Sequence, residues 1–222
     1  MSNSKRKEIL ILIFCLLLGF GLRFYTFDQK SLWLDEVYTF NDSRYNFKDQ
    51  LSYYEENPVY HHPPLFFILT HLFYPPTKPE RDLRIIPLIF GTLSIPLIYF
   101  LARLFCANIA LPCAISLTFM AYHISLSQEG RSYALLMFLG MAGLYFLVKH
   151  IKTSNRRYLL PAALSFAISL HTSYSSIPFA ILSEVFWFYH DDEKGRKYRF
   201  ISFLIFNGLI LLLCLPWALF VA

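Results

Sequence analysis

Repeated apolar runs constrain the fold of this chain more than any other feature. The first run follows a short basic stretch at the N-terminus, and the others follow residue 83 with only short polar connectors between them. The runs cover residues 9–22, 84–104, 107–124, 132–149, 158–173, 175–190 and 199–220. Because about 20 apolar residues cross a bilayer as a helix, most runs are near spanning length. The sequence predicts an all-α, polytopic integral membrane protein with about seven transmembrane helices.

Composition and charge agree with this prediction. The 222 residues are 56% hydrophobic and 16% charged, whereas about a quarter of the residues in a soluble domain are charged. The net charge of +5 comes from Lys and Arg in short clusters between apolar runs, a pattern that indicates membrane topology and not nucleic-acid binding. The four cysteines lie in or beside apolar runs without C-x-x-C spacing, so we interpret them as packing residues and not as a disulfide framework or a zinc site.

The charge clusters also predict an orientation. Arg23, Phe24 and Tyr25 stand where a signal peptide needs small residues, so the first helix should remain uncleaved with a cytoplasmic N-terminus. The apolar segment 61–74 is short and lies between proline pairs. If it lies in the membrane surface, the basic connectors all fall on the cytoplasmic side. We therefore expect a first extracytoplasmic loop at 27–83 with interfacial helices, and a second at 125–131.

Asp35 and Glu36 form an acid pair just beyond the first apolar run. A carboxylate at a half-dry interface has a raised pKa and can accept a proton from an acceptor hydroxyl, or hold a divalent cation beside a phosphate. The alternative is a solvated acidic pair beside an interfacial Trp33.

His61 and His62 precede Pro63-Pro64, and proline is tolerated in the first turn of a helix. This arrangement would direct imidazoles toward the headgroup layer, where histidine can contact a lipid phosphate. An ordinary interfacial histidine pair is the alternative, and two histidines without a third ligand do not indicate zinc.

A second polar cluster lies in the second loop, where Gln128, Glu129, Arg131 and Tyr133 bring together an amide, an acid, a guanidinium and a phenol. Arginine can bind a phosphate with two hydrogen bonds and stabilise charge on a leaving group. An internal ion pair between Glu129 and Arg131 would explain the same residues without a ligand.

Two further polar features are weaker signals. His171 and Tyr174 lie at the end of the fifth apolar run and are candidates for substrate binding. The alternative is structural, because polar residues at a helix end most often cap it or bond to a neighbouring helix. Glu184 is an acid within an apolar run, and we expect it to be paired or to extend toward the cytoplasmic surface.

These polar elements, in this order, resemble the polyprenyl-phosphate-dependent GT-C glycosyltransferases. The nearest resemblance is to bacterial members described as dolichyl-phosphate-mannose-protein mannosyltransferase-like, and the family also contains aminoarabinose transferases. The matching segments are SLWLDEVYTF, HHPPLFFILTHLF, RIIPLIFGTLSIPLIYFLARLF, SQEGRSYALL and LHTSYS. Together they cover most of residues 20 to 180.

The resemblance implies a fold, a location and a set of partners. The whole chain, 1–222, would be the seven-helix transmembrane module of the family, without the C-terminal module that relatives carry. It would lie in a bacterial inner membrane and transfer a hexose or pentose, with inversion, on the extracytoplasmic face. The partners would be a polyprenyl-phosphate sugar donor, membrane lipids and a glycan, lipid or protein acceptor, with no nucleic acid.

The resemblance also implies residue roles. Asp35 would be the catalytic acid/base with Glu36 beside it, and His62 would contact the donor phosphate. Arg131 and Glu129 would belong to the second-loop site, and Arg131 would hold the charge of the leaving phosphate. No nucleotide or other cofactor is required, and whether Asp35 and Glu36 hold a divalent cation stays open.

Two other functions remain as alternatives. A non-catalytic or truncated membrane subunit of a glycan-assembly system is one, since the resemblance implies a C-terminal module that this chain would lack. A transporter is the other, although transporters place ionisable or helix-breaking features near the membrane midplane. In this chain the noted polar residues gather on one side of the predicted membrane.

Overall fold

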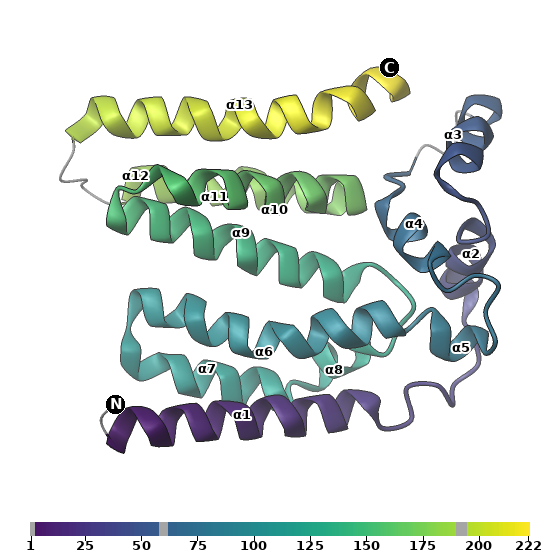
Figure 1. Cartoon of the computed structure of the whole chain (residues 1–222), viewed down its shortest axis with the longest axis horizontal. Coiled ribbons are helices and arrows are strands. Elements are labelled where there is room, and N and C mark those ends of the chain that lie inside the picture. Colours follow the sequence, from purple (N-terminus) through teal and green to yellow (C-terminus); the bar gives the residue numbers. More distant parts are fainter. Residues whose placement is uncertain (1–2, 58–61, 190–194) are drawn as a thin grey trace. The chain divides into compact units, whose positions relative to one another are not determined.

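A computed structural model describes residues 3–57, 62–189 and 195–222, and this described part is helical without strands (Figure 1). The chain divides into two compact units. Unit 1 comprises residues 1–53 and 66–138, and unit 2 comprises residues 54–65 and 139–222. The expectation of an all-α fold is confirmed.

In unit 1, long helices are joined by a set of short ones. α1 (Asn3–Phe24) and α7 (Ala107–Phe119) both pack against α6 (Ile85–Phe105). Cys15, Ile95, Tyr99 and several alanines form the buried core among these helices. The short helices are α2 (Leu34–Asp42), α3 (Phe47–Glu56), α4 (Leu65–His71), α5 (Pro79–Asp82) and α8 (Ala121–Ser127).

Unit 2 contains most of α9 and the helices that follow. α10 packs against α13, and Phe166, Trp187 and Phe206 lie in the buried core of the unit. The elements are α9 (Tyr133–Thr153), η2 (Arg156–Tyr158), α10 (Leu159–Thr172), η3 (Tyr174–Ser176), α11 (Ile177–Ser183), α12 (Phe186–Tyr189) and α13 (Gly195–Val221).

The number of spans differs from the expected seven. In the described part of the chain, three helices are long and apolar enough to cross a membrane: Pro79–Phe105, Tyr133–Thr153 and Gly195–Val221. The pair Ala107–Phe119 and Ala121–Ser127 makes a fourth if the two helices, bent by 61°, count as one span. Seven spans are therefore not shown.

The other apolar runs that were expected to span are too short or are interrupted. In α1, charged residues border the apolar run, which at 1.5 Å per residue is only about 21 Å long. The 14 residues of α10 give a similar length. The run 175–190 is divided at Glu184 into α11 and α12.

The first loop contains the expected short helices. α2, α3, α4 and α5 all lie between residues 27 and 83, and the segment 61–74 contains the seven-residue α4. Helices are thus confirmed in this loop, whereas their position at a membrane surface stays a prediction.

Candidate functional site

The acid pair lies in the first turn of α2. The backbone N–H of Trp33 donates to Oε2 of Glu36 at 3.3 Å, and this bond satisfies one of the free donors at the start of the helix. Carboxylates in a first turn also interact favourably with the helix dipole. Local helix chemistry therefore accounts for acidic residues here before any catalytic role is considered.

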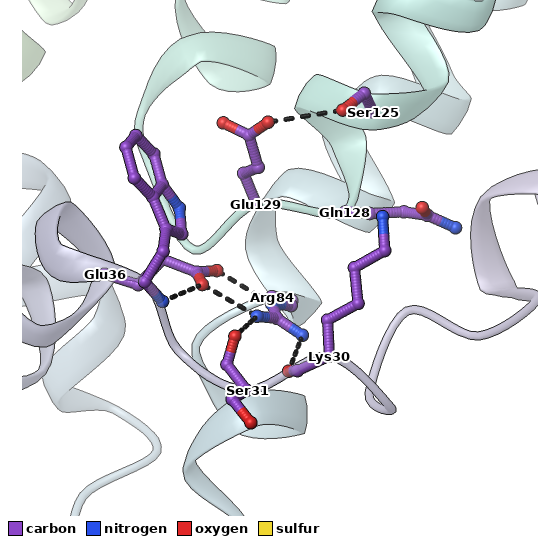
Figure 2. Close-up of a pocket in the computed structure, with 8 residues that line it drawn as sticks. Lys30, Ser31, Glu36, Arg84, Ser125, Gln128 and Glu129 are labelled. Atoms are coloured by element: carbon purple, nitrogen blue, oxygen red, sulfur yellow. Dashed lines mark hydrogen bonds and ion pairs between the residues drawn. The ribbon is translucent and has the colours of Figure 1, made fainter.

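Glu36 is completely buried, and it forms an ion pair with Arg84, which Figure 2 shows. Nε and Nη2 of Arg84 donate to Oε1 and Oε2 of Glu36, both at 2.7 Å. The backbone N–H of Gly130 also donates to Oε1, at 2.6 Å. This carboxylate connects the first loop, the start of α6 and the second loop, so its role is to anchor the site.

Arg84 also fixes the segment before α2. Its Nη1 donates to the carbonyl oxygens of Phe27 and Lys30 at 2.8 and 2.9 Å, and its Nη2 donates to that of Ser31 at 3.3 Å. Buried guanidinium groups are stable only when paired and hydrogen-bonded, and these contacts meet that requirement. The sequence did not reveal this role, because a cation at the edge of an apolar run is ordinarily a topology signal.

Asp35 has different surroundings from its neighbour. Its side chain is half-buried, and its carboxylate has no hydrogen bond or ion pair with any residue that the structure describes. The backbone carbonyl of Asp35, however, accepts bonds from Thr39 Oγ1 at 3.2 Å and Arg131 Nη1 at 3.1 Å. The backbone is fixed while the carboxylate stays available.

A pocket of about 310 Å³ lies beside the anchored carboxylate. Figure 2 shows the side chains from the two loops and from α8 that surround it. The lining residues are Lys30, Ser31, Trp33, Glu36, Arg84, Ser125, Gln128 and Glu129. Asp35 is not among them.

Glu129 also lines this pocket, and unlike Glu36 its carboxylate forms no ion pair with a described residue. Burial raises the pKa of its carboxyl above the usual value, and the nearby Glu36 charge raises it further. The hydroxyl of Ser125 donates to Oε1 of Glu129 at 3.3 Å and opposes that rise, as does the charge of Lys30. An acid with a raised pKa is a better proton acceptor once ionised, so Glu129 has the properties of a proton-transfer group.

Arg131 is attached to α2 and not to Glu129. Its Nη1 donates to Asp35 O and to Thr39 Oγ1 at 3.2 Å, and its guanidinium lies over the Tyr133 ring at 5.8 Å. In the described part of the chain no salt bridge joins Glu129 and Arg131. The interpretation of Glu129 and Arg131 as an internal ion pair is therefore wrong.

Gln128 caps the end of α1, and Arg23 caps the end of α7. Nε2 of Gln128 donates to the carbonyl oxygens of Arg23 and Tyr25 at the end of α1, at 3.0 and 2.7 Å. Nη2 of the buried Arg23 donates to Leu117 O at the end of α7 and contacts His123 Nδ1, both at 3.0 Å. Because the last carbonyls of a helix lack partners within it, these bonds stabilise the break before α8. They also position the loop that carries Glu129.

The remaining predicted residues belong to unit 2. His62 is exposed, and His61 lies outside the described residues. His171 Nε2 contacts Leu213 O at 3.1 Å, and Tyr174 accepts a hydrogen bond from Trp217 Nε1 at 3.0 Å. These two residues link the end of α10 to α13, so the structure gives them packing contacts, and their role in substrate binding stays a prediction.

The contacts of the acid pair restrict how a metal ion could bind there. Among the described residues, no three His, Cys, Asp or Glu side chains are grouped so that they could hold an ion. Both oxygens of Glu36 already accept hydrogen bonds from Arg84. A cation at Asp35 would have to be held without its neighbour.

A family model covers four of the five segments that carry the resemblance, and SLWLDEVYTF at residues 31–40 lies outside its range. The family model described as dolichyl-phosphate-mannose-protein mannosyltransferase matches residues 61–220. No curated protein and no solved structure gave a match. The matched range begins after the acid pair and includes Arg84, Glu129 and Arg131.

Proposed function

Because this chain belongs to the dolichyl-phosphate-mannose-protein mannosyltransferase family, we propose that it transfers a sugar from a polyprenyl-phosphate donor to a glycan, lipid or protein acceptor. The family supports a membrane glycosyltransferase of mannosyltransferase type. The finer points are our proposal: transfer at the extracytoplasmic face of a bacterial inner membrane, with inversion, and with Asp35 as the base.

The difference between the two acids carries the proposal. Glu36 is fully buried and paired with Arg84, whereas the Asp35 carboxylate is partly exposed and unpaired among the described residues. A general base needs access to the proton it removes and a fixed position. Asp35 combines both, because Arg131 and the α2 helix hold its backbone.

In the proposed reaction, an acceptor hydroxyl or amine attacks the anomeric carbon of the donor sugar. The acceptor's proton passes to Asp35 as the new bond forms, and the bond between the sugar and the phosphate oxygen breaks on the opposite face. The electron pair of that bond leaves with the lipid phosphate. Attack from the opposite face inverts the anomeric centre.

Cations near the acids support departure of the phosphate. Nη1 of Arg131 donates to α2, and Nε is buried. Nη2 forms no hydrogen bond in the described part of unit 1, so it can donate to a phosphate. Exposed Lys30 lies in the pocket wall. His62 is our further candidate for the phosphate contact, as its position in the family pattern implies.

The test is sugar transfer in membranes supplied with labelled polyprenyl-phosphate sugars and a panel of acceptors. Asp35→Asn keeps the size of the side chain but removes the base, and we expect at least a 100-fold loss of transfer. Glu55 is exposed on α3 and does not line the pocket, so Glu55→Gln is the matched control and should transfer at the wild-type rate.

Other outcomes assign the base or the function differently. Full activity in Asp35→Asn together with loss in Glu129→Gln would move the base to Glu129. No transfer by correctly inserted wild-type protein, with a suitable donor and acceptor, would favour the non-catalytic subunit. Uptake of a solute that depends on this chain would favour the transporter.

A further inference from the structure

One end of unit 2 concentrates positive charge. Between residues 149 and 199 the sequence has eight Lys and Arg against four Asp and Glu. Three of those acids, Asp191, Asp192 and Glu193, lie outside the described residues. Lys149, Arg156 and Arg157 form no salt bridge with any carboxylate that the structure describes.

Aromatic rings bring these cations together on one surface. Nζ of Lys149 lies 4.9 Å from the ring centres of both Tyr145 and Tyr158. The Arg157 guanidinium also lies over Tyr158, at 4.9 Å, and that of Arg156 lies over Tyr198 at 4.7 Å. The end of α9, the start of α10 and the start of α13 therefore share a basic, tyrosine-rich surface.

The start of α13 is attached to this surface. The Tyr198 hydroxyl donates to the carbonyl of Ser154 at 2.7 Å, and the Tyr198 and His150 rings are 6.1 Å apart. Arg196 and Lys197 precede Tyr198 and are exposed. These contacts place the first turn of α13 beside the connector between α9 and α10.

Apolar surface begins within a turn of the same cations. Phe200 is 60% exposed and Leu204 is 51% exposed, and only 6% of the most apolar stretch of α13 is buried. Exposed apolar side chains on a spanning helix face lipid tails, whereas Lys, Arg and Tyr concentrate at the headgroup level. The boundary between hydrocarbon and headgroups therefore passes between Lys197 and Leu204.

We propose that this surface, formed by Lys149, Arg156, Arg157, Arg196, Lys197 and their tyrosines, binds the phosphates of anionic phospholipids. Guanidinium groups form paired hydrogen bonds with phosphate, and juxtamembrane cations gain affinity for an anionic leaflet. Because these cations lie at the headgroup level of the membrane, a lipid phosphate is a better partner for them than a nucleic acid or an acidic protein. The proposal does not depend on the glycosyltransferase activity.

Spin-labelled lipids test it directly. The purified chain is reconstituted in phosphatidylcholine vesicles with a trace of spin-labelled phosphatidylglycerol or phosphatidylcholine, and electron paramagnetic resonance gives the fraction of each label immobilised by the protein. We expect wild type to prefer phosphatidylglycerol. Arg156→Gln/Arg157→Gln/Arg196→Gln changes exposed residues and should lower that preference by about five-fold or more, since one cation near an anionic surface contributes about that factor.

Two controls test whether a loss of preference comes from this surface and not from the lower total charge or from misfolding. Arg44→Gln/Lys48→Gln/Lys78→Gln removes the same charge from exposed residues of the first loop and should retain the preference. About 1 M salt should weaken it in the wild-type protein, where folding is not in question. Equal binding of both lipids by wild type, or an equal loss in both triple variants, would overturn the proposal.

Discussion

Asp35 and Glu36 are adjacent in sequence, yet the environment separates their roles. Glu36 accepts four hydrogen bonds from Arg84, Gly130 and Trp33, and it has no surface accessible to solvent. Successive residues in a helix point about 100° apart, so the Asp35 side chain leaves that buried environment. One helical step thus separates the buried anchor Glu36 from Asp35, whose accessible carboxylate is the proposed base.

Glu36→Gln should destabilise the protein strongly, because it leaves the buried charge of Arg84 without a counter-ion. A loss of about 3–5 kcal/mol is expected for breaking such a pair, measured as thermal unfolding in detergent micelles. The double variant Glu36→Leu/Arg84→Met should lose less, since no isolated charge remains. If Glu36→Gln unfolds at the same temperature as the wild-type protein, the ion pair contributes little to stability.

Glu129 should make stability depend on pH. Its pKa is raised in the folded state, so its favourable contribution is complete below the ordinary carboxyl pKa and is lost as pH rises through the raised value. Glu129→Gln has no charge to bury, so its melting temperature should increase relative to wild type as the pH goes from 4 to 8. A constant difference over that range would contradict the assigned pKa direction.

At the scale of elements, the break between α7 and α8 organises the second loop. α7 ends at Phe119, and Met120 has extended backbone angles before α8 begins. Arg23 caps the end of α7, while Gln128 caps the end of α1. The interruption of this apolar segment therefore has a structural use, because α8 leads directly to Glu129 and Gly130.

Close packing of α6 on α8 should be sensitive to one methyl group. A Cβ on Gly91 would lie 2.6 Å from Ser127 Cβ, whereas a Cβ on Gly21 would meet nothing within 4 Å. Gly91→Ala should cost about 1–3 kcal/mol by overpacking, and Gly21→Ala should be neutral or stabilising by about 0.5–1 kcal/mol. Thermal unfolding compares the two, and equal effects would contradict the packing of α8 on α6.

For the whole molecule, family membership and candidate spans support an integral membrane protein. The charge clusters predict that its N-terminus and its basic connectors lie on the cytoplasmic side. α13 has 27 residues and is about 40 Å long, which exceeds a hydrocarbon core of about 30 Å. Its ends should therefore reach water while its middle stays in lipid.

Cysteine labelling checks this orientation in intact cells, with the four native cysteines replaced. Lys7→Cys and Lys197→Cys should react with a membrane-impermeant maleimide only after the cytoplasmic side is opened, and Leu211→Cys should stay unreactive. The two positions should be labelled from the same side because each lies in a basic cluster, and cytoplasmic loops carry the excess of Lys and Arg. Labelling of Lys7→Cys and Lys197→Cys from opposite sides would contradict the predicted topology.

The sequence by itself determined the all-α class, the membrane character, the family and the loops that hold the acidic residues. Apolar length and charge clusters are properties of continuous segments, so they can be read without a fold. Only the tertiary structure decided that Glu36 is an anchor, that Arg84 is its partner and that the segment 107–124 is bent. The Glu36 contacts join residues 36, 84 and 130, which meet only when three separate parts of the chain pack together.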